Sequence, residues 1–223
     1  MMNADLFRIR QLMEITRGDE KHSSSTSSTL DVLWVLYDRI LRYDPKNPRS
    51  EARDRFVLSK GHGCVAFYAI LADKGFFSPS LLPTFMKWDS ILGTHPDRNL
   101  VPGAEASTGS LGHGFPMAVG IAMALRAKQK PARVFVLIGD GECNEGTIWE
   151  AALLAGNQHL SRLTCVLVNN HSSSEDLGDL GAKFAAFGWA TITINGRDHE
   201  QIYQALSKTD PDRPTVVIAE IPD

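Results

Sequence analysis

The chain has 223 residues, of which 43% are hydrophobic and 22% charged, a balance typical of a folded domain rather than a disordered or fibrous segment. Lysine and arginine total 23 against 26 aspartate and glutamate residues, so no excess positive charge attracts the chain to nucleic acid or to a membrane surface. No apolar run reaches the length of a membrane span, and the 3 cysteines form neither a disulfide framework nor a CxxC pair, which favours the cytoplasm.

The first half of the chain predicts helices. Residues 7–15 mix charge into a rough helical stripe, so they indicate a helix rather than a signal peptide. The serine-rich segment 22–29 is expected to form an ordered turn, and a second helix is expected at 30–43. A further helix is expected at 116–128.

The second half contains β-branched stretches that predict strands, and helical patterns separate most of them. The predicted strands are 134–138, 164–168, 190–194 and 215–221. Such alternation predicts a three-layer α/β/α fold with a mainly parallel central sheet. No repeat or compositional break divides residues 1–223, which are therefore expected to form a single domain.

Residues 134–170 read as strand, helix and strand, with a polar cluster after each strand. Gly139, Asp140 and Gly141 follow the first strand, and Asn170 follows the second. The strands of a βαβ unit are parallel, so Asp140 and Asn170 are expected at the same carboxyl edge of the sheet, where open α/β folds bind ligands.

A carboxylate and an amide oxygen suit a hard divalent cation such as Mg²⁺, which takes further ligands from water and phosphate. The glycines flanking Asp140 allow a diphosphate to approach the backbone, and the next helix presents free N–H groups. Because Gly, Asp and Asn are also the commonest turn residues, the same pattern is compatible with two ordinary turns.

Four ordered blocks make the chain similar to the transketolase family over nearly its whole length. They are LSKGHG at 58–63, GTHPDRNLVPGAEASTGSLGHG at 93–114, GDGECNEGTIWEAA at 139–152 and NGRDHEQIYQAL at 195–206. The spacing of GDG and NN resembles the family's thiamine-diphosphate-binding motif. The resemblance implies the diphosphate-binding domain of a split transketolase, with the pyrimidine-binding domain on a separate C-terminal partner subunit.

The resemblance also implies roles for individual residues. The metal, Mg²⁺ or alternatively Ca²⁺ or Mn²⁺, is expected on the side chains of Asp140 and Asn170 and the backbone carbonyl of Ser172. Thiamine diphosphate is expected to contact His62, Gly109, Ser110, Leu111, Gly139, Asp140, Gly141, Glu142 and Asn170. The expected catalytic residues are His22, His62, His95 and Glu145.

Each assignment has an alternative, and the chain departs from the family in two places. Isolated histidines are more often structural, Glu145 also suits the first turn of a helix, and the loop 109–111 equally fits a tight turn. Arg197 stands where the family often has a histidine, and polar residues in 171–180 replace glycine and apolar residues.

The implied reaction transfers a two-carbon ketol unit from a ketose or ketose phosphate to an aldehyde. A heterotetramer of two copies of each chain is expected, without nucleic acid or membrane. The alternatives are a subunit of a deoxyxylulose-phosphate-synthase-like or 2-oxo-acid-decarboxylating enzyme, and a non-catalytic subunit that stabilises its partner. An apolar face for the partner is expected around Leu111, Phe115, Ile148 and Trp149.

Overall fold

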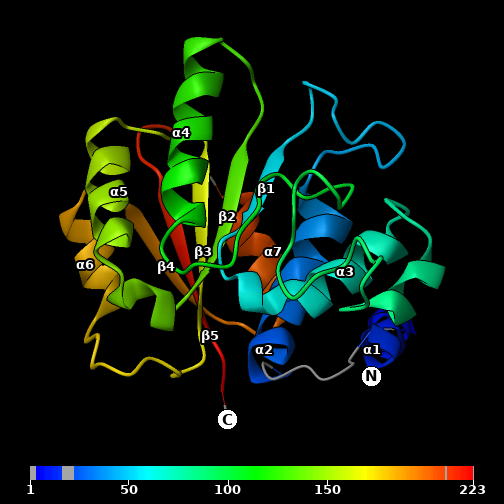
Figure 1. Ribbon diagram of the computed structural model, residues 1–223. Coiled ribbons are helices and arrows are strands. Elements are labelled where there is room, and N and C mark those ends of the chain that lie inside the picture. Colours follow the sequence, from blue (N-terminus) through cyan, green and yellow to red (C-terminus); the bar gives the residue numbers. More distant parts are fainter. Residues whose placement is uncertain (1–3, 17–22, 209, 223) are drawn as a thin grey trace.

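The computed structural model describes residues 4–16, 23–208 and 210–222, which form a five-stranded parallel sheet covered by helices on both sides (Figure 1). The strands are β1 (Arg55–Leu58), β2 (Val134–Gly139), β3 (Leu163–Asn169), β4 (Ala190–Asn195) and β5 (Thr215–Glu220). Their order is β1-β2-β3-β5-β4, and neighbouring strands are parallel. The predicted three-layer fold is confirmed.

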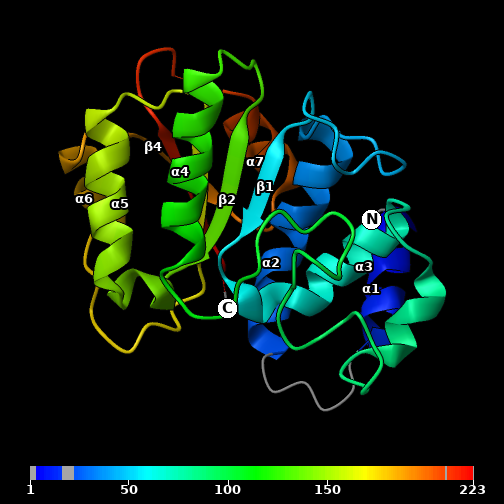
Figure 2. The same ribbon diagram turned by 45° about the horizontal axis from the view of Figure 1, so that its top comes forward.

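Two groups of helices enclose the sheet (Figure 2). One side carries α4 (Gly114–Ala127), α5 (Gly146–Asn157) and α6 (Leu180–Ala186), and the other carries α1 (Ala4–Thr16), α2 (Ser23–Val35), α3 (Cys64–Asp73) and α7 (His199–Ser207). Shorter helical turns are Leu36–Ile40, Gly61–Gly63, Pro79–Thr84 and Gly141–Asn144. No helix in the described ranges is long and apolar enough to cross a membrane.

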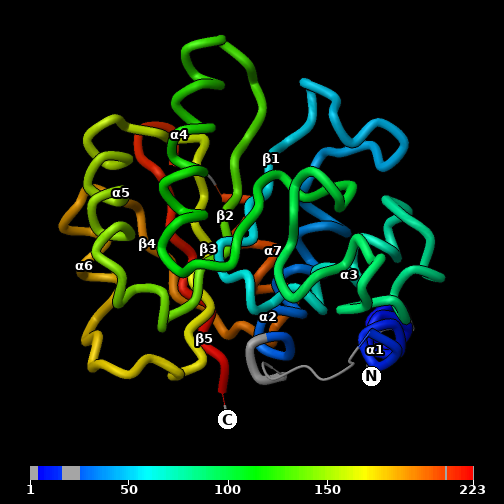
Figure 3. The backbone as a smooth tube through the Cα atoms, in the orientation of Figure 1, coloured from blue at the N-terminus to red at the C-terminus, as the bar shows by residue number. Residues whose placement is uncertain are grey.

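The central strands form the core because both of their faces are covered. All residues of β2 are buried, and successive side chains point to opposite sides: Val136 packs in the cluster under α4 and α5, and Phe135 in the cluster under α2 and α3. The backbone trace in Figure 3 shows residues 75–105 on the same side as α1 and α3, away from α5 and α6.

The predicted strands agree with β2, β3, β4 and β5 to within one residue at each end. The sequence does not predict β1, because its four residues are too few to display a pattern. The ordered turn expected at 22–29 is wrong where the structure describes it, because α2 begins at Ser23. His22 lies outside the described residues.

Small side chains in α2 permit close packing against the turn Gly61–Gly63. A Cβ added to Gly63 would lie 3.0 Å from Oγ1 of Thr29. The same hydroxyl donates to the carbonyl of Thr26 at 3.0 Å, which satisfies it inside the helix. Tertiary packing therefore overrides the weak helix propensity of a serine and threonine run.

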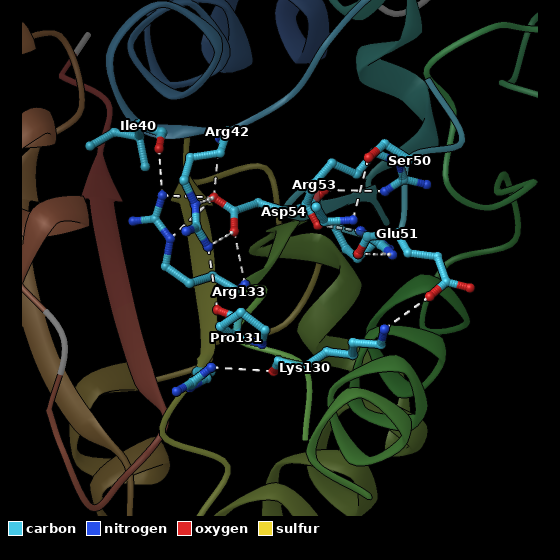
Figure 4. Close-up of polar contacts among 12 residues, drawn as sticks. Ile40, Arg42, Ser50, Glu51, Arg53, Asp54, Lys130, Pro131 and Arg133 are labelled. Atoms are coloured by element: carbon cyan, nitrogen blue, oxygen red, sulfur yellow. Dashed lines mark hydrogen bonds and ion pairs between the residues drawn. The ribbon is translucent and has the colours of Figure 1, made fainter. Parts of the chain in front are cut away.

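A buried carboxylate joins the start of β1 to the start of β2 (Figure 4). Asp54 accepts hydrogen bonds from Arg42 Nη2 at 2.9 Å and from Arg133 Nη2 at 2.7 Å. Burial raises the pKa of Asp54, but the hydrogen bonds from the two arginines outweigh it and hold the pKa below its ordinary value. The carboxylate is therefore fully engaged by these two arginines.

A close helix contact gives the first testable prediction. A Cβ on Gly156 of α5 would lie 1.7 Å from the carbonyl oxygen of Phe187, so Gly156→Ala is expected to lower the free energy of unfolding by about 3 kcal/mol. Gly120 of α4 is the matched control, because a Cβ there meets nothing within 4 Å. Gly120→Ala is expected to raise stability by about 0.5–1 kcal/mol. If urea unfolding gave similar small changes in the free energy of unfolding for both variants, the close packing of Gly156 against Phe187 would be contradicted.

Candidate active site

Asp140 and Asn170 lie together at the carboxyl edge of the sheet, as the βαβ pattern predicts. β2 and β3 are paired in parallel up to Gly139 and Val168. Oδ1 of Asp140 lies 3.1 Å from the hydroxyl oxygen of Ser172, and Oδ1 of Asn170 lies 2.8 Å from it. Since the hydroxyl has one hydrogen, it can donate to only one of them at a time. Two acceptor oxygens thus converge on one point.

Asp140 also fixes the loop that follows β3. The side chain is 1% exposed, and its Oδ2 accepts from the backbone N–H groups of Ser172 at 2.6 Å and Ser173 at 3.0 Å. The left-handed backbone of His171, with φ 53°, turns the loop back toward Asp140. The polar segment after Asn170 is therefore tied to the carboxylate.

The donors at this point fit a hard divalent cation. The carboxylate of Asp140 and the amide oxygen of Asn170 converge, and a Cβ on Gly141 would lie 4.0 Å from the carbonyl oxygen of Ser172, so that carbonyl faces the same turn. Mg²⁺, Mn²⁺ and Ca²⁺ prefer oxygen ligands of these kinds. The site therefore suits the expected metal.

Lys60 is a site residue that the sequence motifs do not single out. Its side chain packs on Gly139, where a Cβ would lie 2.9 Å from Lys60 Cδ and 3.3 Å from Nζ. The residue is 5% exposed, and Nζ donates to the hydroxyl of Ser28 at 3.4 Å. Burial lowers the pKa of Lys60, while the charges of Asp140 and Glu142 oppose that shift. A buried cation thus lies beside the glycine turn.

Glu142 links three segments of the site. Its Oε1 accepts from the hydroxyl of Ser59 at 2.5 Å and from the backbone N–H of Gly112 at 2.9 Å. The residue is 1% exposed; burial raises the pKa of Glu142, and these hydrogen bonds oppose the shift. The end of β1, the loop before α4 and the turn after β2 are therefore held together by one carboxyl group.

The loop around Gly109 lies against His95, whose ring packs in turn against that of His62. A Cβ on Gly109 would lie 2.9 Å from Cγ of His95, and one on Gly61 would lie 3.0 Å from the Cα of Gly109. The rings of His62 and His95 are edge to face, with centroids 5.3 Å apart. The glycines thus permit close approach of two backbones and an imidazole ring.

The remaining predicted residues lie near this loop with fewer contacts. Glu145 precedes α5, is exposed and makes no capping hydrogen bond, but its Cβ would be 2.7 Å from a Cβ on Gly112. Ser110 is exposed and Leu111 half-buried. Glu145 therefore lies at the start of a helix, as the alternative interpretation of this residue predicted. It is also close to the loop that precedes α4.

Arg197 is held against α2. Its Nη1 donates to Oδ2 of Asp31 and to the carbonyl of Ser27, both at 2.8 Å. Oδ1 of the buried Asp31 lies 2.7 Å from Nε2 of His199. Arg197 and His199 thus tie the connection between β4 and α7 to α2, and this guanidinium is engaged inside the protein.

The expected apolar face is wrong in part. Phe115 and Ile148 are both 0% exposed and belong to the core, because the helices turn these side chains toward the sheet. Trp149 is half-buried and donates from Nε1 to the carbonyl of Cys143 at 2.9 Å. The exposed apolar side chains of α4 and α5 are instead Met117, Leu153 and Leu154.

Known proteins resemble this chain over most of its length. Residues 2–221 match the family described as transketolase, thiamine diphosphate binding domain. A Rhodococcoides fascians protein named ferredoxin fas2 is 51% identical over 212 residues, 94% of this chain and 70% of that protein. A 6-deoxy-6-sulfo-D-fructose transketolase subunit of a Clostridium species is 39% identical, covering 92% of this chain and 77% of the relative.

An apulose-4-phosphate transketolase subunit of Phocaeicola vulgatus is 39% identical, covering 90% of this chain and 74% of the relative. A Pichia stipitis transketolase variant in complex with fructose-6-phosphate superposes with a TM-score of 0.86 at 26% identity, over 98% of this chain and 36% of that one. The resemblance found in the sequence is confirmed: the chain belongs to the transketolase family and carries its thiamine diphosphate binding domain.

Proposed function

We propose that residues 1–223 form a single diphosphate-binding domain, which makes up a split transketolase together with a separate pyrimidine-binding subunit. The complex transfers a two-carbon ketol unit from a ketose or ketose phosphate to an aldehyde. The observation that carries this proposal is the convergence of Asp140 and Asn170 on the hydroxyl of Ser172 at the carboxyl edge of β2 and β3. Relatives that are named as transketolase subunits support the split arrangement.

The metal is held by the side chains of Asp140 and Asn170 and by the carbonyl of Ser172, with Mg²⁺ as the expected ion and Ca²⁺ or Mn²⁺ as substitutes. Thiamine diphosphate supplies the nucleophilic carbon and the electron sink of ketol transfer. Gly141, where a Cβ would meet other atoms only at 4.0 Å, leaves the backbone open to the diphosphate, whereas the side chain of Lys60 covers Gly139. Lys60, buried beside Gly139, adds a positive charge that stabilises the diphosphate oxygens.

The aminopyrimidine side of the cofactor rests on Gly109, Ser110 and Leu111. Glu142 keeps that loop in place through Gly112 and is a positioning residue, because its Oε1 already accepts two hydrogen bonds from the protein. Glu145 lies beside the same loop and is exposed, so it is available for a contact with the partner chain.

His62 and His95 are the proposed proton-transfer groups for the reacting sugar, with His22 as a third. Imidazole donates and accepts protons near neutral pH. The edge-to-face arrangement of His62 and His95 places two such rings beside the loop on which the cofactor rests. The protein therefore binds and orients the sugar and moves its hydroxyl protons.

Replacing His95 separates this role from a structural one. In the complex with the partner, His95→Ala is expected to lower kcat/KM by about 100-fold or more, with little change in melting temperature or cofactor affinity. His159→Asn is the control, because the His159 ring is exposed beside the carbonyl of Asp212, at 3.2 Å, and Asn tolerates its left-handed backbone. A large loss of stability with normal turnover of the folded fraction would show that His95 has a structural role and no role in proton transfer.

Product analysis tests the reaction class. The complex is supplied with an aldehyde acceptor and either a ketose phosphate or pyruvate as donor. Ketol transfer predicts a chain-extended ketose from the first donor and no carbon dioxide from the second. Decarboxylation of pyruvate would replace the proposal with a 2-oxo-acid enzyme.

The assembly is proposed as a heterotetramer of two copies of each chain, located in the cytoplasm. The cytoplasmic location is supported by Cys64, Cys143 and Cys165, which are buried and free of disulfides, as is usual for proteins of reducing compartments.

A further inference from the structure

An open cavity of about 580 Å³ lies between the segment 48–55 and the loop 98–105. Figures 1 and 2 show these two parts of the chain side by side. Arg55, the first residue of β1, lines the cavity, whereas the other end of β1 leads into Ser59 and Lys60. The cavity therefore lies at the amino end of the strand whose carboxyl end reaches the candidate active site.

Arginine side chains dominate the lining, which contains Arg49, Arg53, Arg55 and Arg98 but only one carboxylate, Glu105. The side chains of Arg53 and Arg55 are 17% and 11% exposed, and that of Glu105 is 12% exposed. Glu105 lies 2.5 Å from Arg53 Nη1 and 3.8 Å from Arg55 Nε. Two largely buried guanidinium groups thus share one carboxylate.

The neighbouring carboxylates Asp54 and Glu51 are bound to groups outside the cavity, and they offset the positive charge of Arg55 only in part. Figure 4 shows Asp54 directed at Arg42 and Arg133, and Glu51 paired with Lys130 at 3.1 Å. Asp97, next to Arg98, accepts from the backbone N–H of Asn99 at 2.7 Å and from the hydroxyl of Ser107 at 3.1 Å. These carboxylates are held by other groups, so the lining keeps a net positive charge.

Repulsion between the crowded arginine charges affects the pKa of Arg55. Burial lowers the pKa of Arg55 and the adjacent charge of Arg53 lowers it further, whereas the charges of Glu105, Asp54 and Glu51 oppose the shift without cancelling it. An anion placed between the guanidinium groups would relieve this repulsion, because opposite charges interact strongly where water is scarce.

We propose that this cavity binds a small anion with two or more negative charges, held by the exposed Arg49 and Arg98 at its mouth. Arg53 and Arg55 add positive charge beneath it, because their guanidinium groups already donate to backbone carbonyls, among them those of Pro48 and Glu51. Guanidinium groups match phosphate and carboxylate oxygens with paired hydrogen bonds. The volume lies within the range of small-molecule sites, about 300–1,000 Å³. Arg98 lies in the same loop as His95, so a bound anion contacts the loop that enters the candidate active site.

Isothermal titration calorimetry with inorganic pyrophosphate and with citrate tests the proposal on the full chain. The protein and buffers are freed of divalent metal by dialysis over a chelating resin, and the titration is repeated in an Asp140→Asn variant, so that metal-dependent binding at the cofactor site is removed. Saturable binding with one anion per chain is expected under both conditions. Tighter pyrophosphate binding identifies a phosphoryl ligand, and tighter citrate binding identifies a polycarboxylate.

The double variant Arg49→Glu and Arg98→Glu changes the two exposed arginines and leaves the buried pair with Glu105 intact. It is expected to weaken anion binding by at least about tenfold. Arg10→Glu, a charge reversal of the same kind at one exposed position of α1, is the control and is expected to leave the affinity nearly unchanged.

Three results would overturn the proposal: no saturable binding of either anion, undiminished binding by the double variant, or an equal loss in Arg10→Glu. Binding that appears only when divalent metal is added, or that disappears in Asp140→Asn, would also overturn it, because the anion would then occupy the cofactor site. That last result would leave the proposed function intact, so the two proposals fail separately.

Discussion

Replacing Asp140 by alanine is expected to lower the affinity of the assembled protein for thiamine diphosphate by at least about tenfold. Asp140 is the only charged side chain in the proposed metal set, and its two oxygens also hold the loop through Ser172 and Ser173. The change therefore removes a metal ligand and leaves two backbone N–H groups without their acceptor, at a cost of roughly 1–3 kcal/mol.

Asp140→Asn separates the two effects, because asparagine keeps the shape and one acceptor oxygen but not the charge. It is expected to retain more of the stability than alanine and to show a similar loss of Mg²⁺-dependent affinity in calorimetry. Asp176→Ala is the control, since Asp176 is exposed and accepts a local hydrogen bond from the backbone N–H of Gly178 at 2.9 Å. Undiminished affinity of folded Asp140→Ala would refute the metal assignment.

Much of the sheet is predictable because its strands are buried on both faces. Such strands are recognised as short runs of β-branched residues, which is how the sequence locates β2, β3, β4 and β5. β1 is too short to show this pattern. The start of α2 resembles a turn in sequence because it is rich in serine and threonine. These residues are helical because they pack against the turn Gly61–Gly63, and local helix propensity cannot reveal that contact.

The proximity of the proposed metal donors is predictable, because the parallel crossover itself places Asp140 and Asn170 at one edge. Lys60 and the positioning role of Glu142 are not, because they depend on contacts between segments that lie far apart in the chain, such as the bond from Ser59 to Glu142. A lysine two residues after the end of β1 is the available signal. Phe115 and Ile148 show the converse, since apolar side chains near a site can belong to the core.

The isolated chain is expected to show no transketolase activity at any concentration of thiamine diphosphate. The family resemblance places the carboxylate that activates the aminopyrimidine on the pyrimidine-binding domain, which is proposed to reside on the partner. The outer surfaces of α4 and α5 leave Met117, Leu153 and Leu154 between 39% and 47% exposed, which suits a protein interface. Addition of the partner is therefore expected to produce both a larger complex in light scattering and turnover.

Variants of the exposed apolar residues connect assembly to activity. Met117→Lys and Leu153→Asp are expected to weaken assembly and abolish turnover while leaving the melting temperature of the isolated chain nearly unchanged, because these side chains lie outside the core. Gln204→Asp, at an exposed position of α7, is the control for an added surface charge. Normal assembly of both apolar variants would show that the interface lies on another surface of the chain.

Turnover by the chain alone would contradict the split-enzyme proposal itself. It would require that a carboxylate of this chain reach the aminopyrimidine, and the carboxylates near the proposed ring-binding loop are Glu142 and Glu145. Glu142 is buried and accepts two hydrogen bonds, and Glu145 directly precedes α5, where the family resemblance implies a contact between subunits. The expected absence of activity without the partner therefore rests on the family resemblance, which implies that the activating carboxylate comes from the pyrimidine-binding domain.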